Sequence, residues 1–168
     1  MYYQMISQCA LAVGNLETYL NKAEHFATVK DFDIEILMTS RIAPDMQPFI
    51  YQAQSACDYL KAGAAWLSGQ APPKHEDSER TIDEVRERIR KTIAFVRSVD
   101  AMQYEGAGSR QISVAWAGGK RLSGEDYLLQ MIVPNVFFHV CTAYAILRSN
   151  GVDVGKMDFL GRIRWIES

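Results

Sequence analysis

Residues 134–152, PNVFFHVCTAYAILRSNGV, are an apolar run that ends in a glycine and carries one histidine near its middle. The run favours a helix from Asn135 to Asn150, because Gly151 stands where the glycine that follows a helix belongs. Pro134 predicts a kink or a split at the start of this helix. The histidine, His139, poses the functional question, since it could be a metal ligand, a catalytic base or a hydrogen-bonded core residue.

Helix geometry limits what His139 can do with its own neighbours. Residues three and four positions away share its face, and they include Asn135, Thr142 and Ala143. A helical pair of zinc or nickel ligands would need a second ligand at Ala143. Cys141 does not replace it, because two residues along a helix correspond to a rotation of about 200°. His139 therefore cannot form a local metal pair.

A metal site would need ligands from other parts of the chain, and few are present. His25 lies near the end of the first predicted helix, and His75 lies in a polar loop. Catalytic zinc normally takes three protein ligands. Gln52 lies beside the core stripe of the second predicted helix, but an amide oxygen is a poor ligand for zinc. We therefore expect no bound metal, and we expect His139 to be hydrogen-bonded inside the fold. If zinc or nickel does bind, His139 should be a ligand.

Outward from this stretch, apolar side chains recur at spacings of three and four in three further segments, which indicates amphipathic helices. The second helix should begin near Asp45 as its cap and end at Gly69. The third should open with a capping box of Thr81 and Glu84. The apolar positions are Ile6, Cys9, Val13, Leu16, Leu20 and Ala23 in the first helix; Met46, Phe49, Ala53, Ala56, Leu60, Ala64 and Leu67 in the second; and Ile82, Val85, Ile89, Ile93 and Val96 in the third.

Between residues 98 and 123 the period changes to two. Ile112, Val114 and Trp116 alternate with other residues, and AGGK follows with turn residues, which indicates a short β-hairpin. Ser123 and Asp126 then cap the last helix. The sequence predicts an all-α antiparallel four-helix bundle, with a short β-hairpin before the last long helix, as a single domain over residues 1–168. The tail, GVDVGKMDFLGRIRWIES, should pack as an ordered coil.

Two sets of charged residues invite interpretation. Arg41 and Asp45 could form a bidentate pair that pins the connector before the second helix, or could bind an anionic ligand. The run HEDSERTIDEVRERIRK is typical of a solvated helix face with pairs such as Glu84 and Arg88. Gln54, Asp58 and Lys61 belong to the face of the second helix that we expect to be solvated.

Composition excludes several classes of protein. The chain has 168 residues, 48% hydrophobic and 23% charged, with a formal charge of -2, so it has no basic footprint for a nucleic acid. The N-terminus lacks the features of a signal peptide, and no run of about 18 apolar residues suggests a membrane span. These features favour a cytoplasmic location. The odd count of cysteines favours buried free thiols at Cys9, Cys57 and Cys141.

Three stretches, RIAPDMQP, QSACDYLKAGAAWLSGQAPP and PNVFFHVCTAYAILRSNGVDVGKMDFLG, resemble an uncharacterised bacterial domain-of-unknown-function family. That family belongs to the DinB/YfiT-like superfamily, which is classed as metalloenzymes. The resemblance spans nearly the whole chain. It implies a four-helix bundle with up-down-down-up connectivity, a homodimer, and a cytoplasmic bacterial protein.

The resemblance also implies a comparison of metal ligands. Superfamily members typically hold a divalent metal with one histidine from the second helix and two from an H-x-x-x-H on the last long helix. Some are thiol-dependent S-transferases or isomerases that use mycothiol or bacillithiol. His139 matches the first histidine of that motif, Ala143 replaces the second, and Gln52 lies near the position of the third ligand.

Three interpretations follow. The first is a DinB-like bundle that has lost the three-histidine site, with a polar pocket around His139, Asn135 and Gln52. The second is a metal-dependent thiol S-transferase or isomerase, in which His139 and Gln52 still help to hold zinc or nickel. The third is a non-catalytic small-molecule binding or stress-response protein that uses the same pocket.

Overall fold

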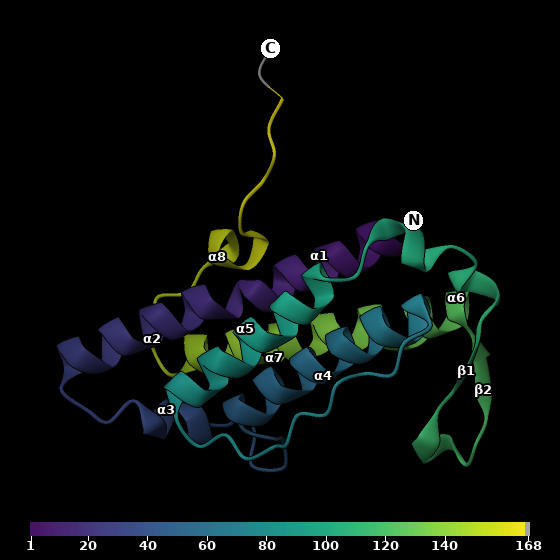
Figure 1. Cartoon of the computed structure of the whole chain (residues 1–168). Coiled ribbons are helices and arrows are strands. Elements are labelled where there is room, and N and C mark those ends of the chain that lie inside the picture. Colours follow the sequence, from purple (N-terminus) through teal and green to yellow (C-terminus); the bar gives the residue numbers. More distant parts are fainter. Residues whose placement is uncertain (167–168) are drawn as a thin grey trace.

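The computed structural model describes residues 1–166 and has a bundle of helices at its centre (Figure 1). One side of the bundle is a nearly continuous pair of helices, α1 and α2, and the others are α4, α5 and α7. Helices α4 and α5 run in the same direction, so the chain between them returns along the length of the bundle. The predicted bundle and its up-down-down-up connectivity are confirmed. The helix bounds are Tyr2–Gly14 for α1, Leu16–Lys30 for α2, Phe49–Ser68 for α4, Ile82–Arg97 for α5 and Val133–Ser149 for α7.

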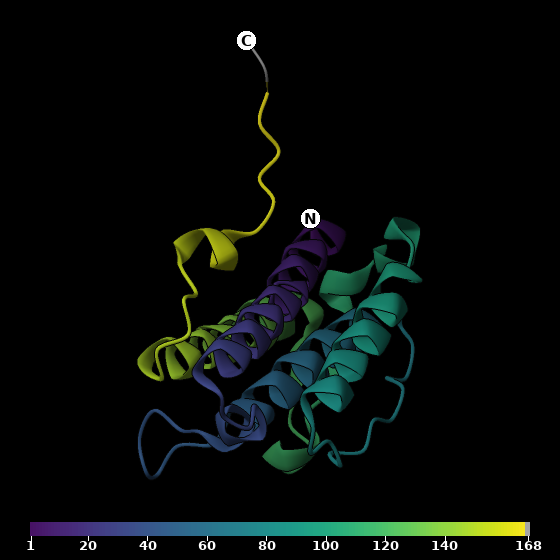
Figure 2. The same ribbon diagram turned by 90° about the vertical axis from the view of Figure 1, so that its left-hand side faces the viewer.

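The core lies between α1, α4, α5 and α7, which pack side by side in both views (Figure 2). Most residues of the three predicted apolar stripes belong to it. Two of the three cysteines are buried there, and burial raises the pKa of Cys9 to about 11 and that of Cys57 to about 12. Cys141 is exposed, so the prediction of a buried thiol is wrong at that position. The same rotation that separates Cys141 from the face of His139 carries its sulfur to the outside of α7.

The first and second predicted helices have different bounds in the structure. The first predicted helix is interrupted at Asn15, and the connector that follows α2 contains a short helix, α3 (Glu35–Thr39). The second predicted helix does not begin at Asp45, because Pro48 takes the cap position and α4 starts at Phe49. A proline disfavours the helical region for the residue before it, so the chain cannot enter a helix ahead of Pro48.

The predicted capping box of α5 and the predicted hairpin are both present. The Glu84 amide donates to Thr81 Oγ1 at 3.3 Å, and the Thr81 amide donates to Glu84 Oε2 at 3.0 Å. Strands β1 (Gln111–Ser113) and β2 (Arg121–Ser123) pair antiparallel after two short 3₁₀ turns, η1 (Ala101–Tyr104) and η2 (Ala107–Ser109). The alternation ends before Trp116, which is 75% exposed in a third turn, η3 (Ala115–Ala117).

The last long helix is irregular at the place where Pro134 disturbs it. It opens as α6 (Gly124–Asp126), with the Asp126 amide donating to Ser123 Oγ at 3.0 Å, as predicted. It then passes through a π-helical turn, η4 (Tyr127–Ile132), into α7. Proline lacks an amide hydrogen, and the wider π turn accommodates that loss without ending the helix. Gly151 follows α7 with φ 95°, which fits its predicted role.

The stretch Gly124–Ser149 has 26 residues and is long and apolar enough, by length and composition alone, to cross a membrane. A core helix of a soluble bundle passes the same test, and this stretch packs against α4 and α1. The expectation of no membrane partner therefore stays a prediction.

The tail is less of a coil than predicted. Residues Lys156–Leu160 form a short helix, α8, and the chain then stands away from the bundle as an extended segment (Figures 1 and 2). The last two residues of the predicted coil, 167–168, lie outside the described residues.

Candidate functional site

His139 meets a side chain of another helix across the seam between α4 and α7. Its Nδ1 lies 2.8 Å from Oε1 of Gln52, and both residues are buried, His139 with 8% of its surface exposed. The amide of Gln52 is fixed from its other end, because Nε2 donates to the Gln47 carbonyl at 2.9 Å. The connector before α4, the helix α4 and the helix α7 are thus joined through the amide of Gln52.

This arrangement determines which ring nitrogen of His139 carries the proton. Since Nε2 of Gln52 donates to a carbonyl, its Oε1 faces the imidazole, and a carbonyl oxygen can only accept. Nδ1 of His139 is therefore the protonated nitrogen in the neutral ring. Nε2 of His139 keeps a lone pair and has no hydrogen-bond partner among the described residues. It could accept a proton or a hydrogen bond from another molecule.

Aromatic rings surround the imidazole. Tyr59 stacks on it with ring centres 5.7 Å apart, while Phe138 and Tyr51 meet it edge-on at 5.2 and 6.2 Å. Burial lowers the pKa of His139, and burial raises the pKa of the stacked phenol of Tyr59. The ring of His139 is therefore neutral near pH 7, in surroundings that favour neutral groups.

The other predicted site residues do not reach His139. Asn135 turns back along its own helix and donates to the Met131 carbonyl at 2.6 Å. Arg41 donates to the Met46 carbonyl at 2.6 Å, and no ion pair joins it to Asp45 among the described residues. The predicted Arg41–Asp45 pair is wrong, since a backbone carbonyl takes the place of the carboxylate. Of the predicted pocket residues, His139 and Gln52 come together.

The residues at this seam do not fit the three-histidine site that the resemblance implies. Ala143 offers no ligand atom, and Oε1 of Gln52 is already engaged by His139 Nδ1. No three histidine, cysteine, aspartate or glutamate side chains within residues 1–166 are grouped so that they could hold a metal ion. Of the three positions that the resemblance implies, His139 offers a ligand atom, Nε2, that has no hydrogen-bond partner among the described residues.

A second polar group, which the sequence analysis missed, lies between α4, α5 and the chain that joins them. Arg88 is only 3% exposed, and its guanidinium contacts Asp58 at 2.7 Å, Asp77 at 2.9 Å and Glu79 at 3.0 Å. The predicted partner of Arg88, Glu84, instead caps its own helix. We call Gln54, Asp58, Lys61, Asp77, Glu79 and Arg88 the Arg88 cluster.

The Arg88 cluster corrects two predictions about solvated faces. Gln54 and Lys61 are buried, Gln54 donating to Glu79 at 2.9 Å and Lys61 to Asp58 at 2.7 Å. Arg88 lies three residues after Val85 on the core-facing side of α5, and this spacing was a signal in the sequence. A buried arginine needs partners of opposite charge, which the acidic run before α5 supplies.

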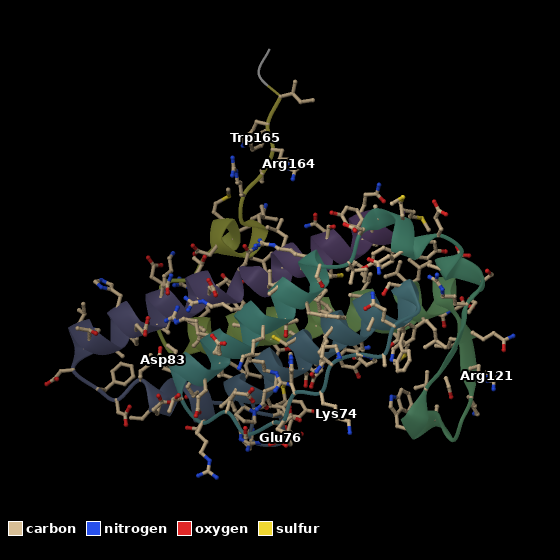
Figure 3. The ribbon with its side chains drawn as sticks, viewed as in Figure 1. Lys74, Glu76, Asp83, Arg121, Arg164 and Trp165 are labelled. Carbon is tan, nitrogen blue, oxygen red and sulfur yellow. The ribbon has the colours of Figure 1, made fainter. Side chains whose placement is uncertain are left out.

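These contacts hold down residues 70–80, which we call the strap. Arg88 also donates to the Glu76 carbonyl at 3.1 Å, so three strap residues converge on one side chain. Lys74 and Glu76 mark the strap along the flank of the bundle (Figure 3). The strap allows α4 and α5 to run in the same direction, because it returns the chain to the end where α4 began.

The stability of the protein should depend on pH through His139. Its folded pKa lies below the ordinary value of 6.5, so the unfolded chain takes up the proton first. The free energy of unfolding should therefore fall as the pH drops through 6.5, and the fall should end below the folded pKa. Urea denaturation at pH 7.5 and 5.5 measures this slope. His139→Gln should flatten the slope and His25→Gln, at an exposed position, should not; equal slopes in all three proteins would contradict the assignment.

The bundle, with one histidine on its last long helix, belongs to the class of DinB-like helical proteins. Residues 1–160 match the family described as a domain of unknown function (DUF1993), and the chain belongs to that family. A crystal structure of a DinB family member protein from Shewanella denitrificans is similar to it, with a TM-score of 0.94 and 39% sequence identity. The match covers 99% of this chain and 95% of that one. No curated protein matches. The resemblance predicted from the sequence is confirmed.

Proposed function

We propose that this DinB-like protein has lost the usual three-histidine metal site and binds a small organic molecule at His139. The observation that carries the proposal is the contact of His139 Nδ1 with Gln52 at 2.8 Å. This contact engages Gln52, the residue near the position of the second-helix metal ligand. It leaves Nε2 of the neutral imidazole available as a hydrogen-bond acceptor. The alternative, a thiol S-transferase or isomerase that depends on zinc or nickel, needs ligands that Ala143 and Gln52 do not supply.

The surroundings of His139 favour one kind of ligand. Tyr51, Tyr59 and Phe138 offer aromatic faces and edges, and rings of this kind pack well against planar groups. Nε2 of His139 would accept one hydrogen bond. A planar, uncharged molecule with an N–H or O–H donor matches both features. Sites for such molecules are commonly apolar, with a few polar groups that fix the orientation of the ligand.

Metal analysis tests the first half of the proposal. Protein purified without a histidine tag should contain zinc and nickel well below one equivalent, and His139→Ala should contain the same amount. A single imidazole is too small a ligand set for a stable site. One equivalent of a transition metal that disappears in His139→Ala would overturn the proposal in favour of the metal-dependent enzyme.

A thermal-shift screen with planar heteroaromatic compounds that carry an N–H or O–H donor tests the second half. Compounds that bind the folded protein should raise its Tm. The shifts should disappear in His139→Ala and persist in His25→Ala, a matched change at an exposed histidine. Shifts of equal size in His139→Ala would contradict a site at this residue.

We also propose that the protein is a cytoplasmic bacterial homodimer without nucleic-acid or membrane partners. The resemblance to the DinB/YfiT-like superfamily supports the dimer, and the formal charge of -2 supports the absence of a nucleic-acid partner. Several large apolar side chains are exposed, among them Phe138, Trp165 and Ile166, which is consistent with a surface that another chain covers.

A further inference from the structure

The C-terminal segment leaves the bundle from a fixed point at the junction of α1 and α2. Asn15 donates to the Phe159 carbonyl at 2.8 Å, and Lys22 pairs with Asp158 at 2.7 Å. Gly161 has φ 66°, and a Cβ there would lie 2.5 Å from Asn15 Oδ1, so this position needs glycine. The direction in which the chain departs is therefore set by packing against Asn15.

Beyond Gly161 the chain is extended and points away from the bundle, with Arg164 and Trp165 along it (Figure 3). Trp165 is 79% exposed and Ile166 is 98% exposed. In an extended chain successive side chains point to opposite sides, so Ile163 and Trp165 share one edge, opposite Arg162 and Arg164. An extended segment with such exposed apolar side chains is a candidate for contact with another surface.

A groove runs between α1 and α5 beside the base of this segment, with a volume of about 1570 Å³. Ile6 and Ile89, both buried, and the half-buried Ile93 give it an apolar lining, and the ion pair of Glu17 with Arg90 lies in its wall. Residues 162–164 border the groove at one side, while Trp165 and Ile166 are not part of its lining. The groove and the apolar edge of the segment are thus adjacent within one chain, but Trp165 on this edge does not occupy the groove.

We propose that residues 162–166 of one copy dock in the α1–α5 groove of a second copy, and that the exchange is reciprocal. This inference rests on the homodimer proposed above. A two-fold axis beside the groove would bring each segment, which starts at the edge of its own groove, over the groove of its partner. Five extended residues reach about 17 Å, which is enough to place Trp165 beyond the edge and over the apolar lining. Glu17 in the groove already pairs with Arg90 at 3.0 Å, so the docking rests on contact of the apolar edge with the apolar lining.

Sedimentation equilibrium tests the exchange through Trp165. The wild-type protein should be a dimer, and Trp165→Ala should raise its dissociation constant by about tenfold or more, as expected for a buried tryptophan at an interface. Trp116→Ala changes a tryptophan of similar exposure, 75% against 79%, on the hairpin and should leave the constant unchanged. A dimer whose affinity is the same in Trp165→Ala would overturn the docking while the dimer stands. A wild-type monomer at all concentrations would overturn both.

Cysteine cross-linking tests which copy receives the segment. In a Cys141→Ser background, which removes the exposed thiol, Ile93→Cys and Trp165→Cys are made in separate chains and mixed under oxidising conditions. A disulfide requires the two Cα atoms to approach within about 7 Å, so a covalent dimer should form only if the segment reaches the partner's groove. Replacing Ile93→Cys by Val29→Cys, at an exposed position on α2 outside the groove, should give none. An internal disulfide in the chain that carries both Ile93→Cys and Trp165→Cys, without covalent dimer, would show docking within one copy and overturn the proposal.

Discussion

Arg88→Met should lower the free energy of unfolding by about 3 kcal/mol or more, because removing one member of a buried ion cluster leaves its partners uncompensated. Methionine keeps much of the packing of the arginine stem, so the loss comes mainly from charge and hydrogen bonds. Glu79, which is largely buried, would keep only Gln54 as a side-chain partner, and Asp58 would keep Lys61. Urea denaturation of the two proteins measures the difference.

Arg90→Met is the matched control on the same helix. Arg90 is exposed and pairs with Glu17 at 3.0 Å, and exposed pairs contribute about 0–1 kcal/mol. Limited trypsin digestion adds a local readout, because Lys74 and Arg80 lie on the strap. Cleavage at these two residues should be faster in Arg88→Met than in Arg90→Met. If both variants lost the same stability and were cleaved at the same rate, the Arg88 cluster would not hold the strap.

Gly124→Ala should be the second most damaging substitution, with a loss of about 3 kcal/mol from overpacking. A Cβ at this position would overlap the backbone carbonyl oxygen of Ala107 in turn η2, and it would also lie 3.2 Å from Leu67. Backbone cannot rotate away as a flexible side chain can. The start of the last long helix and turn η2 would therefore have to separate, which thermal or urea denaturation would detect.

Gly14→Ala should change the free energy of unfolding in the opposite direction. Gly14 ends α1 with helical backbone, and a Cβ there meets nothing within 4 Å. Alanine favours a helix over glycine by about 0.8–1.0 kcal/mol, so this variant should be slightly more stable than the wild type. If Gly124→Ala were also neutral or stabilising, the close approach of Gly124 and Ala107 would not be a constraint.

Periodic and local signals in the sequence predicted most of the fold. The stripes of α1, α4 and α5, the capping box of Thr81 and Glu84, the cap at Ser123 and the glycine at Gly151 depend on residues a few positions apart, and they are present. The start of α4 differs from the prediction because Pro48 disfavours helical backbone in the residue before it. The alternation of apolar residues before the hairpin turn would have buried Trp116, but turn η3 ends the strand before it, and Trp116 is exposed.

The candidate site was only partly accessible from the sequence. Helix spacing showed what His139 could not bind, and the resemblance placed Gln52, 87 residues away, near it. Their direct hydrogen bond became visible only when α4 and α7 were paired. The neighbours on its own face, Asn135 and Thr142, bond instead to carbonyls of their own helix. The Arg88 cluster was missed because charged residues were assigned to solvent by type, although the spacing from Val85 placed Arg88 on the inner side.

The π-helical turn η4 acts as an insertion of one residue that the last long helix absorbs without a break. Each residue of an α-helix advances the phase by about 100°, so residues 124–126 are out of step with α7 by that angle. A helical wheel drawn through the whole of Gly124–Ser149 assigns one end of it to the wrong face. The two ends of the helix can therefore be matched to different neighbours, Gly124 to turn η2 and His139 to α4, without one dictating the orientation of the other.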